Sequence, residues 1–248
     1  MKTVIKKIEG IIVNETPYGE TSKVMQIFTQ ELGIISVMGK GVKSMKSRLR
    51  PFTMKFTYGF FYLYYKEDKL SILKEVDLID SFKNIKSDLL TISYLSYLSE
   101  LSTQVYKHSM ESLVYNLFIQ VLNKMEQGMN PLILTNILEI KYLDFLGVQL
   151  YLEGCVLCGS KNNIVTLDAD SGGYVCKKCY RNQIIVSQKT IKLIRMYYYV
   201  DLLSITKISI SEEVAREINF FLNRYYEKYT GLYLQSKQFL NQMLKIQN

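Results

Sequence analysis

The sequence predicts an α+β protein with a small N-terminal β-barrel, a helical C-terminal domain and a cysteine-rich insert within that domain. Three observations support this fold class. Residues 1–80 contain short β-branched and aromatic runs separated by turns. From about residue 85, apolar residues recur at helical spacing. All four cysteines lie in one stretch of the helical part, between residues 155 and 179.

Five segments of the N-terminal part are predicted as strands. They are residues 4–13, 22–30, 34–38, 54–65 and 70–79. The fourth, MKFTYGFFYLYY, contains Gly59, which indicates a bulge or a barrel corner. Five short strands with one long basic loop fit a small closed barrel such as the OB-fold. Strand counting leaves the SH3-like barrel open as an alternative.

The helical part begins where the apolar period changes. Helices are expected at residues 87–107, 109–126, 131–147, 188–203 and 211–230, with a short one from about 236. Ser87 is predicted to cap the first helix, and Asn130 followed by Pro131 to start the third. We therefore expect two domains, 1–80 and 81–248. Because no Pro- or Ser-rich linker separates them, we expect them to pack closely.

The cysteines form two C-x-x-C knuckles, Cys155/Cys158 and Cys176/Cys179, inside an insert at 153–182. This spacing is typical of a four-cysteine zinc site, and residues 164–175 could form a hairpin between the knuckles. We expect one structural Zn²⁺, because four protein ligands leave no open position for water or substrate. Free thiols, a redox pair and an iron–sulfur site are the alternatives. The absence of a surrounding βαβ pattern argues against the redox pair.

A basic loop links the third and fourth predicted strands. No acidic residue occurs between Glu31 and Glu67. Within this window the stretch GKGVKSMKSRLRP contains Lys40, Lys43, Lys46, Arg48 and Arg50, and Lys55 follows it. Cations that follow a phosphate backbone, next to rings on which bases stack, are typical of single-strand binding. The loop is therefore predicted to bind DNA, with a solvated surface as the alternative.

An aromatic stripe follows the loop. If Gly59 does not break the register, the stripe contains five rings on one face of the strand. They are Phe56, Tyr58, Phe60, Tyr62 and Tyr64. Rings of this kind form barrel core more often than a stacking platform, so the loop is the stronger candidate for DNA contact.

The net charge of the chain and the sequence motifs that it lacks limit the classes of function further. The net charge is +8, with 31 basic and 23 acidic residues, which is compatible with a polyanionic partner. The chain has no P-loop, Rossmann glycine pattern or nucleophile elbow, and His108 is its only histidine. No uncharged stretch exceeds about 12 residues, and charges follow Met1, so we expect a cytoplasmic protein with no membrane span.

Taken together, these residues resemble the RecO family of DNA repair proteins. The N-terminal signature and the zinc insert are the specific parts of the resemblance, which covers nearly the whole chain in family order. The matching segments are GIIVNETPYGETSKVMQIFTQELGIISVMGKGVK (10–43), SRLRPFT (47–53), EVDLIDSF (75–82), FLGVQLYLEGCVLCGS (145–160), GGYVCKKC (172–179) and RYYEKYTGLYLQSKQFL (224–240).

The resemblance implies an N-terminal OB-fold, a zinc-carrying helical domain, and a recombination mediator that is not an enzyme. Such proteins bind single- and double-stranded DNA and anneal complementary strands. With RecR, and in some species RecF, they load RecA onto strands coated by single-strand-binding protein. Several members also bind the acidic C-terminal tail of that coating protein. A cytoplasmic protein that associates with the nucleoid when on DNA is implied.

The resemblance carries over to individual residues at two places. It implies that Cys155, Cys158, Cys176 and Cys179 are metal ligands and, with less precision, that the loop from Lys40 to Arg50 contacts DNA. Arg224 to Leu240 is a candidate contact for the acidic tail, or a segment that only closes the helical core. Two other classes stay open from the residues alone: a nuclease, and a zinc-ribbon transcription or RNA-binding factor.

Overall fold

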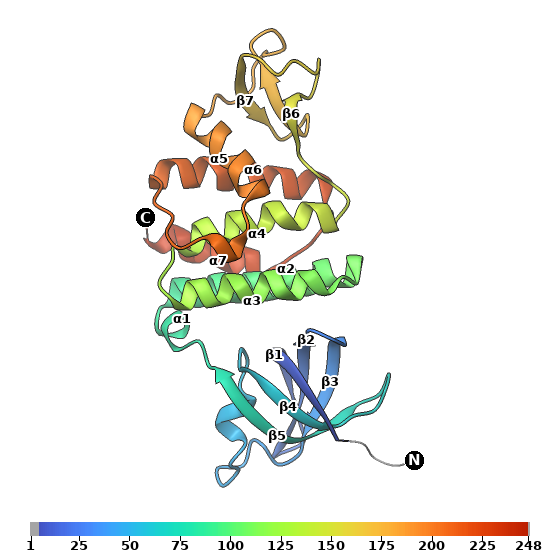
Figure 1. Ribbon diagram of the computed structural model, residues 1–248. Helices are drawn as coiled ribbons and strands as arrows, with labels where there is room; N and C mark the ends of the chain where they lie inside the picture. Colours follow the sequence, from blue (N-terminus) through green and yellow to red (C-terminus); the bar gives the residue numbers. More distant parts are fainter. Residues whose placement is uncertain (1–4, 248) are drawn as a thin grey trace.

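The computed structural model describes residues 5–247 of the chain. Its architecture is α+β, with a sheet of five strands at the N-terminus, stacked helices above it, and a small second sheet at the far end (Figure 1). The first predicted strand starts at Val4, which lies outside the described residues. Within the described range, no helix is both long and apolar enough to cross a membrane.

The N-terminal strands close into a barrel in the order β1-β2-β3-β5-β4. The strands are β1 (Ile5–Tyr18), β2 (Ser22–Thr29), β3 (Gly33–Gly39), β4 (Tyr58–Tyr64) and β5 (Ser71–Asp80). All neighbours pair antiparallel except β3 and β5, which pair parallel at Val37 and Met38. The segment between β3 and β4 contains a short 3₁₀ helix, η1 (Arg50–Thr53).

The barrel encloses an apolar core of its own. Alternation along the strands directs Ile8, Ile12, Met25 and Phe61 inward, where each is at most 2% exposed. The predicted irregularity at Gly59 is confirmed, because the β4–β5 register shifts between Tyr58 and Gly59. A Cβ atom at position 59 would lie 2.4 Å from the carbonyl oxygen of Asp77, so a side chain would push the two strands apart.

The helical domain is built around one central helix. Its elements are α1 (Lys83–Ser87), α2 (Leu89–Ser109), α3 (Ser112–Glu126), α4 (Pro131–Phe145), α5 (Gln188–Tyr199), η2 (Leu202–Ser204), α6 (Glu212–Tyr229) and α7 (Gln235–Gln247). From Ile133 to Leu143 every residue of α4 is buried except Lys141, so neighbouring elements surround this helix.

Two predicted helix boundaries differ from the structure. Asp88, not Ser87, caps α2: its Oδ2 accepts a hydrogen bond from the backbone N–H of Thr91 at 2.7 Å. Ser87 instead belongs to the short α1, where its Oγ donates to the carbonyl of Asn84. The helix expected at 188–203 ends at Tyr199, and η2 follows it. Asn130 caps α4, with Pro131 as the first helical residue, as predicted.

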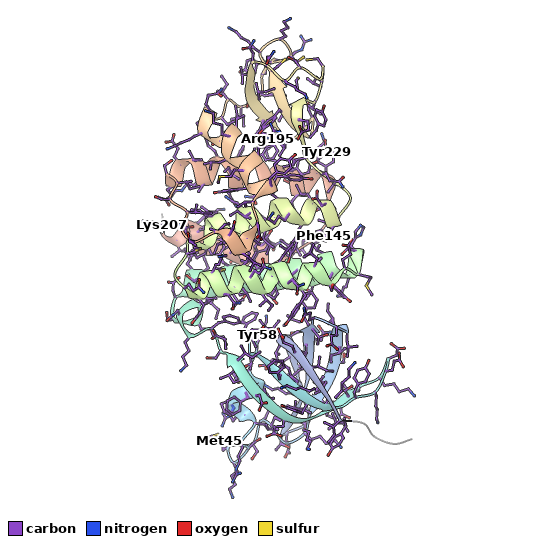
Figure 2. The ribbon with its side chains drawn as sticks, in the orientation of Figure 1. Met45, Tyr58, Phe145, Arg195, Lys207 and Tyr229 are labelled. Atoms are coloured by element: carbon purple, nitrogen blue, oxygen red, sulfur yellow. The ribbon has the colours of Figure 1, made fainter. Side chains whose placement is uncertain are left out.

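Besides the core inside the barrel, another apolar cluster joins the outer face of the barrel to the helices, which agrees with the expected close packing. The ring of Phe28 on β2 lies 5.0 Å from the ring of Tyr106 on α2 and 5.2 Å from that of Tyr115 on α3. Tyr58 on β4 also contributes, because its hydroxyl donates to Glu9 Oε1, which accepts from Tyr115 as well at 3.4 Å. The outer face of the barrel therefore packs directly against the helices, with Tyr58 at the junction (Figure 2).

The cysteine-rich insert leaves the helical stack between α4 and α5 and forms the end of the molecule opposite the barrel (Figure 1). Its strands β6 (Tyr151–Cys155), β7 (Ile164–Asp168) and β8 (Gly173–Cys176) make a sheet in the order β6-β8-β7. The hairpin expected within residues 164–175 is present as β7 and β8. Strand β6, which pairs parallel to β8, has no counterpart in the prediction from the sequence.

Candidate metal centre and nucleic-acid interface

The pairing of β6 with β8 brings the two cysteine knuckles together. Cys155 ends β6 and Cys176 ends β8, and a tight turn follows each of them. In the first turn the N–H of Gly159 donates to the carbonyl of Cys155 at 2.7 Å. In the second, the N–H of Cys179 donates to the carbonyl of Cys176 at 3.0 Å. Because neighbouring parallel strands end at the same edge of a sheet, the two turns face one another.

The four thiols are arranged as a metal would require. Their Sγ atoms all lie within 4.8 Å of one another, and those of Cys158 and Cys176 are 3.6 Å apart. Tetrahedral zinc with Zn–S bonds of about 2.3 Å places its sulfur ligands about 3.8 Å apart. All four cysteines are free thiols. The cluster can therefore hold a metal ion.

The electrostatics of the thiols differ within the cluster. Burial acts to raise the pKa of Cys155, but hydrogen bonds from the backbone N–H groups of Cys176, Leu157 and Cys158 outweigh it and lower the pKa to about 6. The hydrogen bond with Cys158, followed by burial, raises the pKa of Cys179 to about 12. The charge of Cys155 also contributes to the raised pKa of Cys179, and a cation at the centre would favour the ionised form of both thiols.

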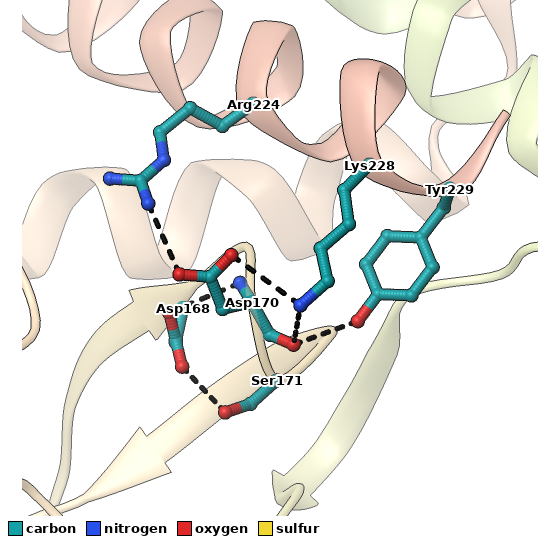
Figure 3. A network of polar contacts seen from close by, with 6 residues as sticks. All are labelled: Asp168, Asp170, Ser171, Arg224, Lys228 and Tyr229. Carbon is teal, nitrogen blue, oxygen red and sulfur yellow. Dashed lines mark hydrogen bonds and ion pairs between the residues drawn. The ribbon is translucent and has the colours of Figure 1, made fainter. Parts of the chain in front are cut away.

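A polar network fastens the insert to the helical domain (Figure 3). The carboxylate of Asp170 pairs with Arg224 at 3.1 Å and with Lys228 at 3.5 Å, both on α6. The carbonyl of Asp170 accepts from Lys228 Nζ and from the hydroxyl of Tyr229, each at 2.8 Å. Asp168 instead closes the β7–β8 turn by accepting from Ser171. Asp170 therefore holds the insert against α6, and Asp168 orders the turn that carries Asp170.

All three cations of the segment from Arg224 to Leu240 form ion pairs within the molecule. Arg224 and Lys228 pair with Asp170, as described above. Lys237 pairs with the buried Glu139 at 2.9 Å and lies 4.2 Å from the ring centroid of Tyr97. These contacts favour the second interpretation of this segment, in which it closes the helical core.

The basic loop presents its cations to solvent. Lys40, Lys43, Lys46, Arg48 and Arg50 are all exposed. None of them takes part in an ion pair within the described part of the chain. The loop is nevertheless shaped by backbone hydrogen bonds, including one from Lys43 N–H to the carbonyl of Thr21 at 2.8 Å. Five positive charges therefore lie on one ordered segment beside the barrel.

Lys55, the sixth predicted contact, lies apart from the exposed loop. It is half-buried and lines a cleft between the barrel and α2. Loss of hydration lowers the pKa of its ammonium group, and the nearby carboxylates of Glu100 and Glu15 oppose that shift. A second hollow of 270 Å³ lies beside the loop and is lined by Lys43, Arg50 and Lys23 among others.

The predicted aromatic stripe is broken at Gly59. Phe60, Tyr62 and Tyr64 are half-exposed on the outer face of β4, where Lys7 Nζ lies 4.1 Å from the ring centroid of Phe60. Phe56 and Tyr58 are buried at the junction with the helices, and Phe56 has a positive φ of 65°. The three outer rings therefore lie outside the barrel core, and Gly59 separates them from Phe56 and Tyr58.

The sequence did not single out several polar residues that line the cleft around Lys55. Asn14 and Gln26 come from the barrel, Gln104 and Lys107 from α2, and Gln235 from the start of α7. These positions are far apart in the chain, and no local spacing pattern links them. Only the packing of barrel against helices brings them together.

Two family models together match almost the whole chain. The model described as "Recombination protein O N terminal" matches residues 1–82, and "Recombination protein O C terminal" matches residues 86–238.

Full-length relatives agree with the family models. A "DNA repair protein RecO" of Halalkalibacterium halodurans is 33% identical over 241 residues, which is 96% of this chain and 94% of the relative. One of Bacillus cytotoxicus is 34% identical over 248 residues, covering 98% of this chain and 100% of the relative. One of Bacillus cereus is 32% identical over 250 residues, with the same two shares.

Proposed function

The chain belongs to the RecO family of DNA repair proteins, and from that premise we propose that it is a non-enzymatic, DNA-binding recombination mediator. The observation that carries this proposal is the exposed loop from Lys40 to Arg50, whose five cations have no ion-pair partner among the described residues. Phosphate contacts from such side chains give affinity for any DNA sequence.

We propose that the barrel is an OB-fold and that the chain divides into domains 1–80 and 81–248. Support for the OB-fold comes from the five closed strands and from the parallel pairing of β3 with β5. The division is supported by the second apolar core, which lies entirely within the barrel.

We propose further that Cys155, Cys158, Cys176 and Cys179 hold one Zn²⁺ with a structural role. The spacing of the four Sγ atoms supports this assignment. A tetrathiolate ion accepts no further ligand, so it would support the insert and would not activate water.

Annealing is the activity that a cationic mediator of this kind would perform. Holding two strands together requires their mutual repulsion to be screened, and the net charge of +8 supplies cations for this. No nucleotide-binding loop occurs in the sequence, so annealing should proceed without ATP. The proposed partners are single- and double-stranded DNA, RecR, the acidic tail of single-strand-binding protein and, indirectly, RecA. The proposed location is the cytoplasm, on the nucleoid when bound to DNA.

The test is annealing of complementary strands that single-strand-binding protein has coated, in buffer without ATP. We expect the protein to accelerate annealing on these strands, and a charge-reversed loop variant to lose the effect. Annealing of bare strands alone would reduce the protein to a plain DNA-binding factor. Metal-dependent cleavage of the strands would indicate a nuclease, and strong preference for one sequence or for RNA would indicate a zinc-ribbon factor of another kind.

A further inference from the structure

A polar cleft of 420 Å³ lies where the barrel meets the helices. Strands β1 and β2 form one wall, and α2 with the first residues of α7 forms the other. Only Val13 and Ile34 among its lining residues are apolar. Its amides and cations are Asn14, Gln26, Lys55, Gln104, Lys107 and Gln235. The volume lies within the range of small-molecule sites, about 300–1,000 Å³.

The one carboxylate in the cleft already has partners. Glu100 on α2 accepts hydrogen bonds from the backbone N–H groups of Gln235, at 3.3 Å, and Ser236, at 2.8 Å. It also accepts from the hydroxyl of Ser236. Glu100 therefore caps the first turn of α7 from outside that helix. Its lone pairs serve this cap, and little of its hydrogen-bonding capacity remains for a ligand.

The two cations of the cleft have no bonded anion among the described residues, and Lys55 Nζ lies 4.7 Å from the ring centroid of Phe56. Neither Lys55 nor Lys107 forms an ion pair between residues 5 and 247. Lys55 is half-buried, and loss of hydration lowers the pKa of its ammonium group. A cation that has lost water without gaining a bonded anion is stabilised when an anion arrives.

The cleft adjoins the hollow beside the basic loop. Asn14 and Lys55 line the cleft, while their chain neighbours Glu15 and Met54 line the hollow. The charge of Glu15 acts on Lys55, so the two spaces are electrostatically close. A strand bound at Lys43 and Arg50 would thus meet a second pair of cations at the junction of barrel and helices.

We propose that this cleft binds one nucleotide unit of a single DNA strand that continues from the basic loop. This inference rests on the proposed function of DNA binding. Lys55 and Lys107 would contact phosphate, and the amides of Asn14, Gln26 and Gln104 would donate to and accept from base edges. A duplex is too wide for a space of this volume, so the cleft distinguishes single strands from duplexes.

The test compares single-strand and duplex binding of the full-length chain. The variants are Lys55→Gln, Lys107→Gln and the pair together, with Lys207→Gln, an exposed position outside both hollows, as the matched control. We expect the double variant to weaken binding of a labelled thymidine oligonucleotide roughly tenfold or more. Its log–log salt slope should flatten by about 1.4, or about 0.7 per lost contact. Duplex affinity should fall by a clearly smaller factor than single-strand affinity, since the five exposed cations of the loop are intact.

A footprint keeps the inference testable if Lys55→Gln unfolds. Lysine acetylation of the unaltered protein, with and without a short thymidine oligonucleotide, should show protection of Lys55 and Lys107 but not of Lys207. If the oligonucleotide leaves the acetylation of Lys55 and Lys107 unchanged, as it should that of Lys207, the cleft is not a binding site. Equal losses of single-strand and duplex affinity in the double variant would also overturn the proposal. If the unaltered protein binds no DNA, the proposed function itself fails, and this outcome is distinct from the others.

Discussion

The barrel and the cysteine insert are two small sheets that are stabilised in different ways. The barrel buries ten apolar residues in a core of its own, Phe61 and Ile27 among them. The insert has no such core: its buried Leu152, Leu167 and Tyr174 belong to the core of the helical domain. Five strands can close around their own side chains, whereas three cannot. We therefore expect the insert to depend on its four thiols and on its contacts with α5 and α6.

Metal removal should show the largest difference between the two sheets. We expect chelation, or Cys176→Ser, to expose the amides of residues 151–182 to hydrogen exchange and to leave β1–β5 protected. Coordination by cysteines contributes of order 10 kcal/mol to folding in zinc peptides, and the insert has no apolar core to replace it. Mass spectrometry of exchanged peptides and metal analysis measure the effect. If the amides of the insert stay protected from hydrogen exchange in the metal-free protein, the insert does not depend on a metal and the contrast with the barrel is wrong.

Truncation inside the barrel should have the opposite pattern. Phe61→Ala removes a ring that is 0% exposed and should lower the free energy of unfolding by about 3–5 kcal/mol. Metal content should not change, because the ring lies in the barrel core. Tyr62→Ala, on the outer face of the same strand, is the matched control and should cost far less. Chemical denaturation followed by circular dichroism distinguishes the two variants.

Charge reversal in the basic loop should separate the stability of the barrel from its binding. Lys43, Lys46 and Arg48 changed together to Glu should weaken DNA binding at least a hundredfold, about 2.8 kcal/mol, while the barrel stays folded. With about six phosphate contacts in the unaltered protein, the single-strand salt slope should be near −4. Fluorescence anisotropy at several salt concentrations measures both. Unchanged affinity in a folded triple variant would place the DNA surface elsewhere.

The tether between the insert and α6 should have the smallest effect. Asp170→Asn removes two exposed ion pairs, with Arg224 and Lys228, but keeps the carbonyl that Lys228 and Tyr229 contact. Exposed pairs contribute about 0.2–1 kcal/mol each. We expect slightly faster hydrogen exchange in the β7–β8 turn and unchanged metal content. Glu212→Gln, which removes a helix-surface pair with Arg216, should leave that turn unaffected.

Much of the fold was predictable because its signals are local. The Asn130–Pro131 start of α4 depends on a side chain that reaches two or three residues along the chain, to Leu132 and Ile133. A bulge or barrel corner was predicted at Gly59, and the stripe of five rings was predicted only if Gly59 kept the register. The bulge moves Tyr58 into the junction with the helices, so the rings on the two sides of Gly59 face different surroundings.

The candidate functional site also has features that the sequence predicted and features that it did not. The two C-x-x-C knuckles and the cations of the loop could be read from spacing, since each knuckle or run is contiguous. Strand β6 could not, because its partner β8 lies beyond the intervening β7. The position of Lys55 could not be predicted either, because Ser99 and Glu100, which line the same cleft, lie on a helix 44 or more residues away in the chain.

The sequence by itself determined the hydrophobic period of each helix and strand, the spacing of the cysteines, the positive charge of the loop and the family of the protein. These features depend on residues that lie within one turn or one strand of each other in the chain. Their interactions therefore do not require contacts with distant segments. Only the tertiary structure decided that β6 and β8 end together and that Asp170 meets α6. It also decided that amides from β1, β2, α2 and α7 line the same cleft as Lys55. Such contacts form between distant segments once a shared core orients them, and no local pattern in the chain encodes them.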